Sequence, residues 1–288
     1  MTLASAQARP RRRIVASPGK WLTWAVVAFF FVNLLGVIGT VVVNSLGRRW
    51  FSAWLPQGFT THWYSDAWRE FHLSDVLRVT LEVAVAVVVI SVLVGVPAAY
   101  AMARRDFPGK RLVLLLFLVP VLLPPITYGI PLATVLYKFQ LAGTLFGIIA
   151  ANLVPTIPFV VLTMTPFIEQ IDPRIEAAAR MCGARTSSVM LRVLTPLLLP
   201  GVLAASILVL VRTVGMFELT FLSSGDSTST LVVALYYSVF SAGIRAQQSV
   251  DAMAVIYTGF MLVLLVVALR FINPTQLVTR VQDEGTRA

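Results

Sequence analysis

The chain has 288 residues, of which 58% are hydrophobic and only 12% are charged, and its mean hydropathy is +0.84. A soluble domain carries about 25% charged residues, so this composition indicates a chain that lies in a lipid bilayer. The net charge of +10 is compatible with nucleic-acid binding, but the cations lie at the ends of apolar runs, as in membrane proteins. No nucleic-acid partner is therefore expected. The single cysteine, Cys182, excludes an intramolecular disulfide framework and a cysteine-based metal site.

The N-terminal part consists of a polar, basic tail (residues 1–20) followed by a first spanning helix over residues 21–43. A cleaved signal peptide is the alternative, but its apolar region is normally about 7–15 residues long, and this run is longer. Residues 44–75 are rich in aromatic side chains, which favour the headgroup level of a membrane. Together, residues 21–75 are expected to form one spanning helix and an extracytoplasmic loop.

Residues 76–272 are expected to form the core domain, an all-α unit with five further spans. Apolar runs place these spans at residues 76–103, 112–137, 144–165, 197–222 and 249–272, since a bilayer needs about 20 apolar residues. Prolines at 120, 124, 125 and 131 must break the third span, and Pro155 and Pro158 kink the fourth. Residues 231–248 form either a re-entrant or a peripheral helix, and a polar tail (273–288) ends the chain.

The distribution of Lys and Arg predicts the orientation of the six spans. The N-terminal tail, the 104–111 loop, the 166–196 loop and the C-terminal end hold five, four, four and three basic residues, whereas the opposite loops hold three, one and one. Basic residues accumulate on the cytoplasmic side. Both termini and the 166–196 loop are therefore predicted to be cytoplasmic in a multi-pass membrane protein.

A short polar helix is expected at residues 172–185, between the fourth and fifth spans. Asp172 suits the N-cap, Pro173 suits the first helical position, and Gly183 can adopt the left-handed conformation that ends a helix. The helix is expected to have a face of small residues that permits close packing by a partner protein: Ala177, Ala178, Ala179 and Gly183. An ordinary polar loop helix is the alternative interpretation.

Ionisable residues inside spans are costly in lipid and mark a cavity or a partner. Arg78 and Glu82 are four residues apart, so they are expected to pair on one face of the second span. Arg212 and Glu218 are six residues apart in the fifth span, on different faces, and each needs another partner. With Asp251, near the outer start of the sixth span, these two residues are the candidates for a translocation path.

No motif for enzymatic chemistry is visible. The chain contains no H-E-x-x-H, no G-x-S-x-G and no Walker G-x-x-x-x-G-K-[ST] sequence. It cannot bind ATP through a P-loop of its own, and no catalytic residue, cofactor or metal site is expected in it.

The sequence around the polar helix resembles the signature of type I ABC-importer permeases, which is E-A-A, three residues, Gly, nine residues and I-x-L-P. Aligned on Gly183, the alanines fall on Ala178 and Ala179, and the end of the signature falls on residues 193–196, closing with Pro196. Two positions depart from the signature. Ala177 stands at the glutamate position with Glu176 one residue early, and Thr195 replaces leucine.

The resemblance implies a permease subunit in the bacterial inner membrane, whose central helix docks onto a cytoplasmic ABC ATPase, expected as a dimer. It implies a second permease subunit, a copy or a different chain, and an extracytoplasmic solute-binding protein. The residues implied in ATPase coupling are Glu176, Ala177, Ala178, Ala179, Arg180, Gly183 and Pro196. ATP hydrolysis would occur in the separate partner subunit, so the chain itself would not be an enzyme.

Residues 212–254 are similar to the polyamine-type branch of these permeases, with Phe221, Gly225 and the pair Asp251-Ala252 in common. The branch has an acidic pair before the glycine, where this chain has Gly215 and Met216, and Val232 replaces its proline. The similarity suggests a cationic solute without naming it. The alternative function is an ion-coupled secondary transporter, which would also use broken helices and buried charges but needs no ATPase.

Overall fold

The computed structural model describes residues 18–50, 56–240 and 246–270. The predicted terminal tails lie outside these ranges, except for residues 18–20. Within these ranges the chain consists of helices joined by short connections, and several of the helices are long and apolar. The predicted fold class, an all-α membrane protein, is confirmed.

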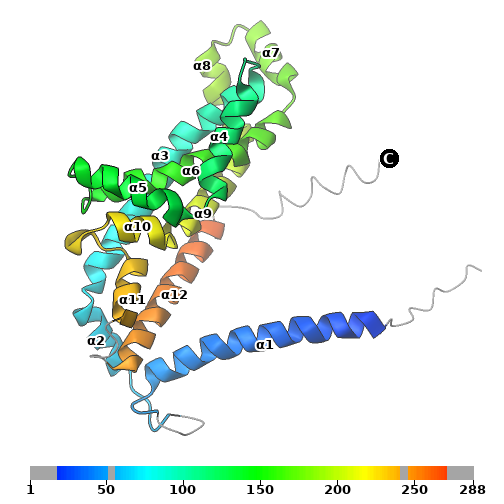
Figure 1. Cartoon of the computed structure of the whole chain (residues 1–288). Coiled ribbons are helices and arrows are strands. Elements are labelled where there is room, and N and C mark those ends of the chain that lie inside the picture. Colours follow the sequence, from blue (N-terminus) through cyan, green and yellow to red (C-terminus); the bar gives the residue numbers. More distant parts are fainter. Residues whose placement is uncertain (1–17, 51–55, 241–245, 271–288) are drawn as a thin grey trace, which may run out of the picture.

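The helices form an elongated body with two distinct ends (Figure 1). α7 and α8 lie at one end, called here the α7 end, and α2 lies at the opposite end, called the α2 end, while α1 projects away from the body. In chain order the elements are α1 (Pro18–Leu46), α2 (His62–Glu70), α3 (Leu73–Arg104), α4 (Lys110–Leu122), α5 (Pro125–Lys138), α6 (Leu145–Glu169), α7 (Pro173–Met181), α8 (Thr186–Ser188), a π-helical turn (Val189–Leu194), α9 (Thr195–Val214), α10 (Phe217–Ser223), a 3-10 turn (Asp226–Thr228), α11 (Leu231–Phe240) and α12 (Gln247–Arg270).

Five helical stretches in the described residues are long and apolar enough to cross a membrane: α1, α3, α6, the continuous stretch Thr186–Val214, and α12. The predicted third span is broken, as expected, because α4 and α5 meet at an angle of 97°. Leu123 and Pro124 form the break, since proline has no N–H to continue the helix. Counting this pair as one span gives six, so the six-span topology stays a prediction. α6 continues through Pro155 and Pro158 as one helix of 25 residues.

The predicted fifth span, 197–222, is wrong at both ends. The helical stretch begins at Thr186 and reaches α9 through the π-helical turn. It ends at Val214, and a second short helix, α10, begins at Phe217. Gly215 is a weak helix former, and Met216 has an extended ψ of 96°. An apolar run does not reveal such a break, because both segments are equally hydrophobic.

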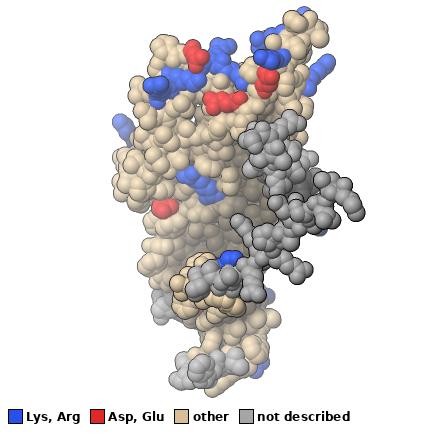
Figure 2. All heavy atoms as spheres, turned by 90° about the vertical axis from the view of Figure 1, so that its right-hand side faces the viewer, with Lys and Arg blue, Asp and Glu red and all other residues tan. Residues whose placement is uncertain are grey.

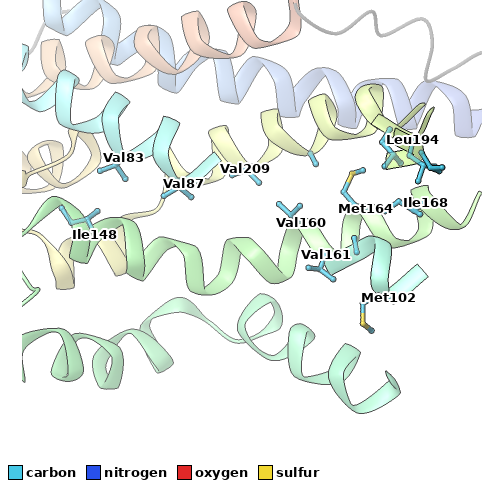
Figure 3. Close-up of a cluster of buried hydrophobic side chains, with 14 residues drawn as sticks. Val83, Val87, Met102, Ile148, Val160, Val161, Met164, Ile168, Leu194 and Val209 are labelled. Carbon is cyan, nitrogen blue, oxygen red and sulfur yellow. The ribbon is translucent and has the colours of Figure 1, made fainter. Parts of the chain in front are cut away.

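α3, α6 and α9 enclose the main core, where their side chains point toward one another (Figure 3). Lipid tails are as apolar as these side chains, so close packing rather than hydrophobicity holds the helices together. Two glycines permit the approach. A Cβ on Gly95 of α3 would lie 2.7 Å from a Val160 methyl of α6, and one on Gly201 of α9 would lie 2.7 Å from the Phe167 ring. The helices that position the site are therefore firmly packed.

α1 and α11 differ from this core. The apolar stretch of α1 is not buried against the rest of the chain, and α1 meets α12 only near the α2 end (Figure 1). α11 has ten residues, about half of what a bilayer crossing needs. It packs against α12 and α3, and the residues directly after it lie outside the described ranges.

Candidate functional site

α7 begins and ends as its sequence predicts. The Asp172 carboxylate accepts a hydrogen bond from the backbone N–H of Arg174 at 2.9 Å, and Pro173 occupies the first turn. At the other end Gly183 has a φ of +82°. The N–H of Gly183 donates to the carbonyl of Arg180, and the N–H of Ala184 donates to that of Ala179. These two bonds form a Schellman motif, so α7 is a closed, self-contained unit.

A buried ion pair fixes α7 to the end of α3. Arg104 Nε donates to Glu176 Oε1 at 2.8 Å, and the Tyr100 hydroxyl donates to Glu176 Oε2 at 2.6 Å. Arg104 Nη2 also donates to the carbonyl of Ile171 at 2.6 Å, just before α7. The ion-paired side chains are 12% and 8% exposed. Glu176 therefore faces inward, toward α3.

The alanines of α7 lie on different faces. Ala179 packs against the core, whereas Ala177 and Ala178 are exposed, because successive helical residues are about 100° apart. Met181 is 88% exposed, and the Arg180 side chain lies beside it in solvent. The outward face of α7 thus combines two small residues, Ala177 and Ala178, with longer side chains around them, which are those of Arg174, Ile175, Arg180 and Met181. Such a face offers both a close approach and charged groups to another protein.

Charged side chains gather at the α7 end of the molecule, while the broad middle carries few (Figure 2). Gly183 is exposed there, and a Cβ built on it meets nothing within 4 Å. Glycine is required at this position by its backbone conformation rather than by an internal contact. Pro196 is exposed at the start of α9, directly after the π-helical turn.

The break between α9 and α10 separates the two predicted path residues. Arg212 lies in the last turn of α9 and Glu218 in the first turn of α10. The helix dipole favours a cation at the first place and an anion at the second. Arg212 Cζ lies 5.4 Å from the centre of the Phe159 ring, a cation–π distance. Glu218 is partly buried, and among the described residues it forms no hydrogen bond or ion pair.

α5 reaches the break between α9 and α10 at Tyr128. This residue packs against a cluster that includes Met216, in the break, and Leu219 of α10. Its hydroxyl is buried, and none of the described residues hydrogen-bonds it. A buried hydroxyl with no partner among the described residues therefore lies beside the break that separates Arg212 from Glu218.

Aromatic rings extend this region from α10 to α11. The Phe217 and Phe221 rings are stacked with centres 5.1 Å apart, and Phe217 lies 4.7 Å from Tyr236. The cluster ends at Phe240, whose ring centre lies 4.3 Å from Tyr236 and whose side chain is 72% exposed. Aromatic faces attract cations and stack on flat groups.

Asp251 does not join this group. Its carboxylate accepts hydrogen bonds from the Asn44 side chain of α1 and, at 3.3 Å, from Gln247 one turn earlier in α12. The structure thus places Asp251 at the contact between α1 and α12. Its hydrogen bond with Asn44 links α1 to α12, and its part in a translocation path stays a prediction.

A cavity of about 710 Å³ opens at the α2 end. Asp75, Arg78 and Glu82 of α3, Asp226 and Tyr237 contribute to its wall. The predicted pair is confirmed, since Arg78 Nε donates to Glu82 Oε1 at 2.7 Å. α3 therefore reaches from this cavity to the ion pair beneath α7.

Sequence reasoning did not find Tyr100, Arg104 and Tyr128. Tyr100 and Arg104 are four residues apart, so they share a helix face. This spacing indicates in the sequence alone that the two polar side chains can bind one group together. Nothing in the sequence pairs them with Glu176, 72 residues beyond Arg104.

These features define an integral membrane protein with a packed helical core and a capped helix at one charged end. Residues 91–275 match the family described as binding-protein-dependent transport system inner membrane component. The chain belongs to this family, as its resemblance to type I ABC-importer permeases predicted.

The names of individual relatives refer to different solutes. A probable molybdenum ABC transporter permease of Haloferax volcanii is 33% identical over 181 residues, 60% of this chain and 65% of that protein. The spermidine/putrescine permease PotC of Escherichia coli is 28% identical over 265 residues, 91% of this chain and 93% of that protein. The aligned part spans slightly less than two thirds of the Haloferax protein.

A solved structure shares the fold. A chain of a bacterial ABC transporter involved in the import of the acidic polysaccharide alginate has a TM-score of 0.72 and 18% identity, covering 91% of this chain and 98% of that chain. At this identity the likeness concerns the architecture alone.

Proposed function

We propose that this chain is the membrane-spanning permease subunit of an ATP-driven importer and that α7 docks onto a cytoplasmic ABC ATPase. The observation that carries the proposal is the construction of α7. It is capped at both ends, fixed to α3 by a buried ion pair, and exposes Ala177 and Ala178 between longer side chains. Caps are common to most helices, so the feature that distinguishes α7 is the buried ion pair that holds this exposed helix in place.

The proposed topology has both termini and α7 in the cytoplasm. Its support is the excess of Lys and Arg in the loops on that side. The tails 1–20 and 273–288 would be cytoplasmic, residues 21–75 would contribute a span and an outer loop, and residues 76–272 would form the permease core. The cavity at the α2 end would then open outward, toward a solute-binding protein.

A second permease subunit is proposed because one chain leaves apolar surfaces uncovered. α1 exposes both aromatic and aliphatic side chains along its length, and the bent α4–α5 pair has no buried residue in α4. Lipid covers such surfaces in part. The partly buried Glu218 would be costly against lipid, so the face around it requires a water-filled path shared with the second subunit.

The proposed solute is small and positively charged, with a polyamine as one candidate. Glu218 supplies a carboxylate, and the rings of α10 and α11 supply faces that attract cations. The relatives include both a molybdenum and a spermidine/putrescine permease, so family membership does not fix the solute. Membership of a binding-protein-dependent transport family favours an ATP-driven importer over the alternative function, an ion-coupled secondary transporter.

Uptake into membrane vesicles tests the proposed function. The solute to be tested is the one bound by the expected extracytoplasmic solute-binding protein. Its uptake should require ATP on the cytoplasmic side and should stop when the gene of the ATPase partner is deleted. Uptake that persists without the ATPase, driven by an ion gradient, would contradict the proposal and restore the secondary-transporter hypothesis.

A further inference from the structure

Both oxygens of the Glu176 carboxylate are occupied within the chain. Arg104 donates to one of them and Tyr100 to the other, and the residue is 6% exposed. A docking partner cannot reach this carboxylate without breaking two charge-assisted bonds, which are the strong class of hydrogen bond. Glu176 therefore acts inside the permease rather than on its surface.

The two donors belong to one face of α3 and hold two points of the α7 segment. Arg104 bonds Glu176 in the middle of α7 and also bonds the Ile171 carbonyl before its N-cap. Tyr100 lies one turn earlier and bonds Glu176 again. Three bonds to three different acceptor atoms fix both the position and the angle of α7 relative to α3, whereas one bond would leave a pivot.

α3 is also fastened at its other end. The Thr80 hydroxyl oxygen accepts a hydrogen bond of 2.8 Å from the backbone N–H of Leu231, which begins α11. α3 is a single helix of 32 residues, which corresponds to a length of about 48 Å. Its first turns line the cavity at the α2 end, so one continuous helix connects that cavity to α7.

From this arrangement we infer that Tyr100, Arg104 and Glu176 are positioning residues that form a latch between α7 and α3. The latch makes both helices move as one body, so a displacement of α7 reaches the cavity at the α2 end through α3. The inference rests on the proposed function, because the ATPase is the source of that displacement. It assigns a role to Glu176 that is distinct from surface contact with the ATPase.

Distance measurements between two spin labels test the latch. The native Cys182 is exposed beside α7 and is the only cysteine in the sequence, and Ser74→Cys supplies an exposed site in the first turn of α3. The full chain, purified with its partner subunits in nanodiscs, is measured without nucleotide and trapped with ATP and vanadate. The wild-type latch should give one narrow distance distribution, unchanged between the two conditions.

Two variants with matched controls separate the latch from general stability. Tyr100→Phe removes one hydroxyl and Glu176→Gln removes one charge, while Tyr137→Phe and Glu169→Gln make the same changes at exposed sites. The two latch variants should broaden the distribution and make it depend on nucleotide, with the ATPase still attached and hydrolysing ATP. The controls should match the wild type.

Three results would overturn the inference: a wild-type distance that shifts on trapping, latch variants that keep the narrow distribution, or loss of the ATPase together with the latch. The last would make the three residues merely structural. Failure of the proposed function is distinguishable, because the chain would then purify without any ATPase. The nucleotide-free comparison of variants and controls would still decide whether the latch exists.

Discussion

The α7 end and the α9–α10 break use charged side chains in opposite ways. At the α7 end, Arg104 and Glu176 are buried and satisfy each other and their neighbours. At the break, Arg212 faces an aromatic ring and Glu218 has no hydrogen-bond or ion-pair partner among the described residues. Paired charges hold a helix at a fixed angle. The charges at the break are the ones proposed to interact with a solute, and the following predictions test this contrast.

The topology gives the largest expected effect, because its outcome is all or none. After residue 60, only a reporter enzyme that works outside the cytoplasm should be active. After residue 185, only a reporter enzyme that works in the cytoplasm should be active. The physical reason is the Lys and Arg excess on the α7 side. The reverse pattern would place α7 on the extracytoplasmic side, where it could not dock onto a cytoplasmic ATPase.

Removing the buried arginine should cost the most stability. Arg104→Ala leaves Glu176 buried without its cation, and breaking such a pair lowers the free energy of unfolding by about 3–5 kcal/mol. Arg105→Ala, at the next and exposed position, should change it by less than about 0.5 kcal/mol. Denaturant unfolding in detergent measures both, and equal stabilities of the two variants would show that the ion pair holds nothing.

Gly183→Val should have a smaller effect on stability but a specific effect on assembly. A non-glycine residue in the left-handed conformation costs about 1–2 kcal/mol, so the end of α7 should rearrange and the ATPase should be lost. Gly109→Val is the matched control, since Gly109 has a φ of +85° and Gly183 one of +82°, both with open space around the Cβ position.

The measurement is the amount of ATPase that co-purifies with each variant. Equal retention by Gly183→Val and Gly109→Val would mean that the end of α7 takes no part in docking.

Glu218→Gln should have the smallest effect on stability. The loss of an anion in the first turn of α10 costs about 0.3–1 kcal/mol, so assembly should be intact while uptake is impaired. Asp66→Asn, which changes a carboxylate on α2 far along the chain, is the control and should transport normally. Wild-type uptake by Glu218→Gln, measured in vesicles, would reduce the break to a structural feature.

The sequence predicted what depends on local rules. The N-cap at Asp172, the left-handed Gly183 and the pairing of Arg78 with Glu82 all involve residues within a few positions of one another. The break at Pro124 follows from the missing donor of proline. These features need no knowledge of the tertiary structure.

The sequence did not predict features that depend on tertiary contacts. Arg212 and Glu218 were placed on one helix, but Gly215 and Met216 interrupt it within an unbroken apolar run. The resemblance names Glu176 among the residues for ATPase coupling, but it does not show that Arg104, 72 residues away, holds this carboxylate inside the protein. No local pattern distinguishes a charge that points into the protein from one that points out.

Cross-linking from Cys182 tests the central claim, that α7 docks onto an ATPase, most directly. Cys182 is exposed beside the outward face of α7 and is the only cysteine in the chain. It is therefore the one position of this chain that a short photo-reactive maleimide labels, and only cross-linked peptides that contain Cys182 are counted. In native membranes the account predicts a cross-link to a P-loop ATPase that decreases in Gly183→Val. Cross-links to lipid or to membrane-spanning proteins, with none to an ATPase, would contradict it.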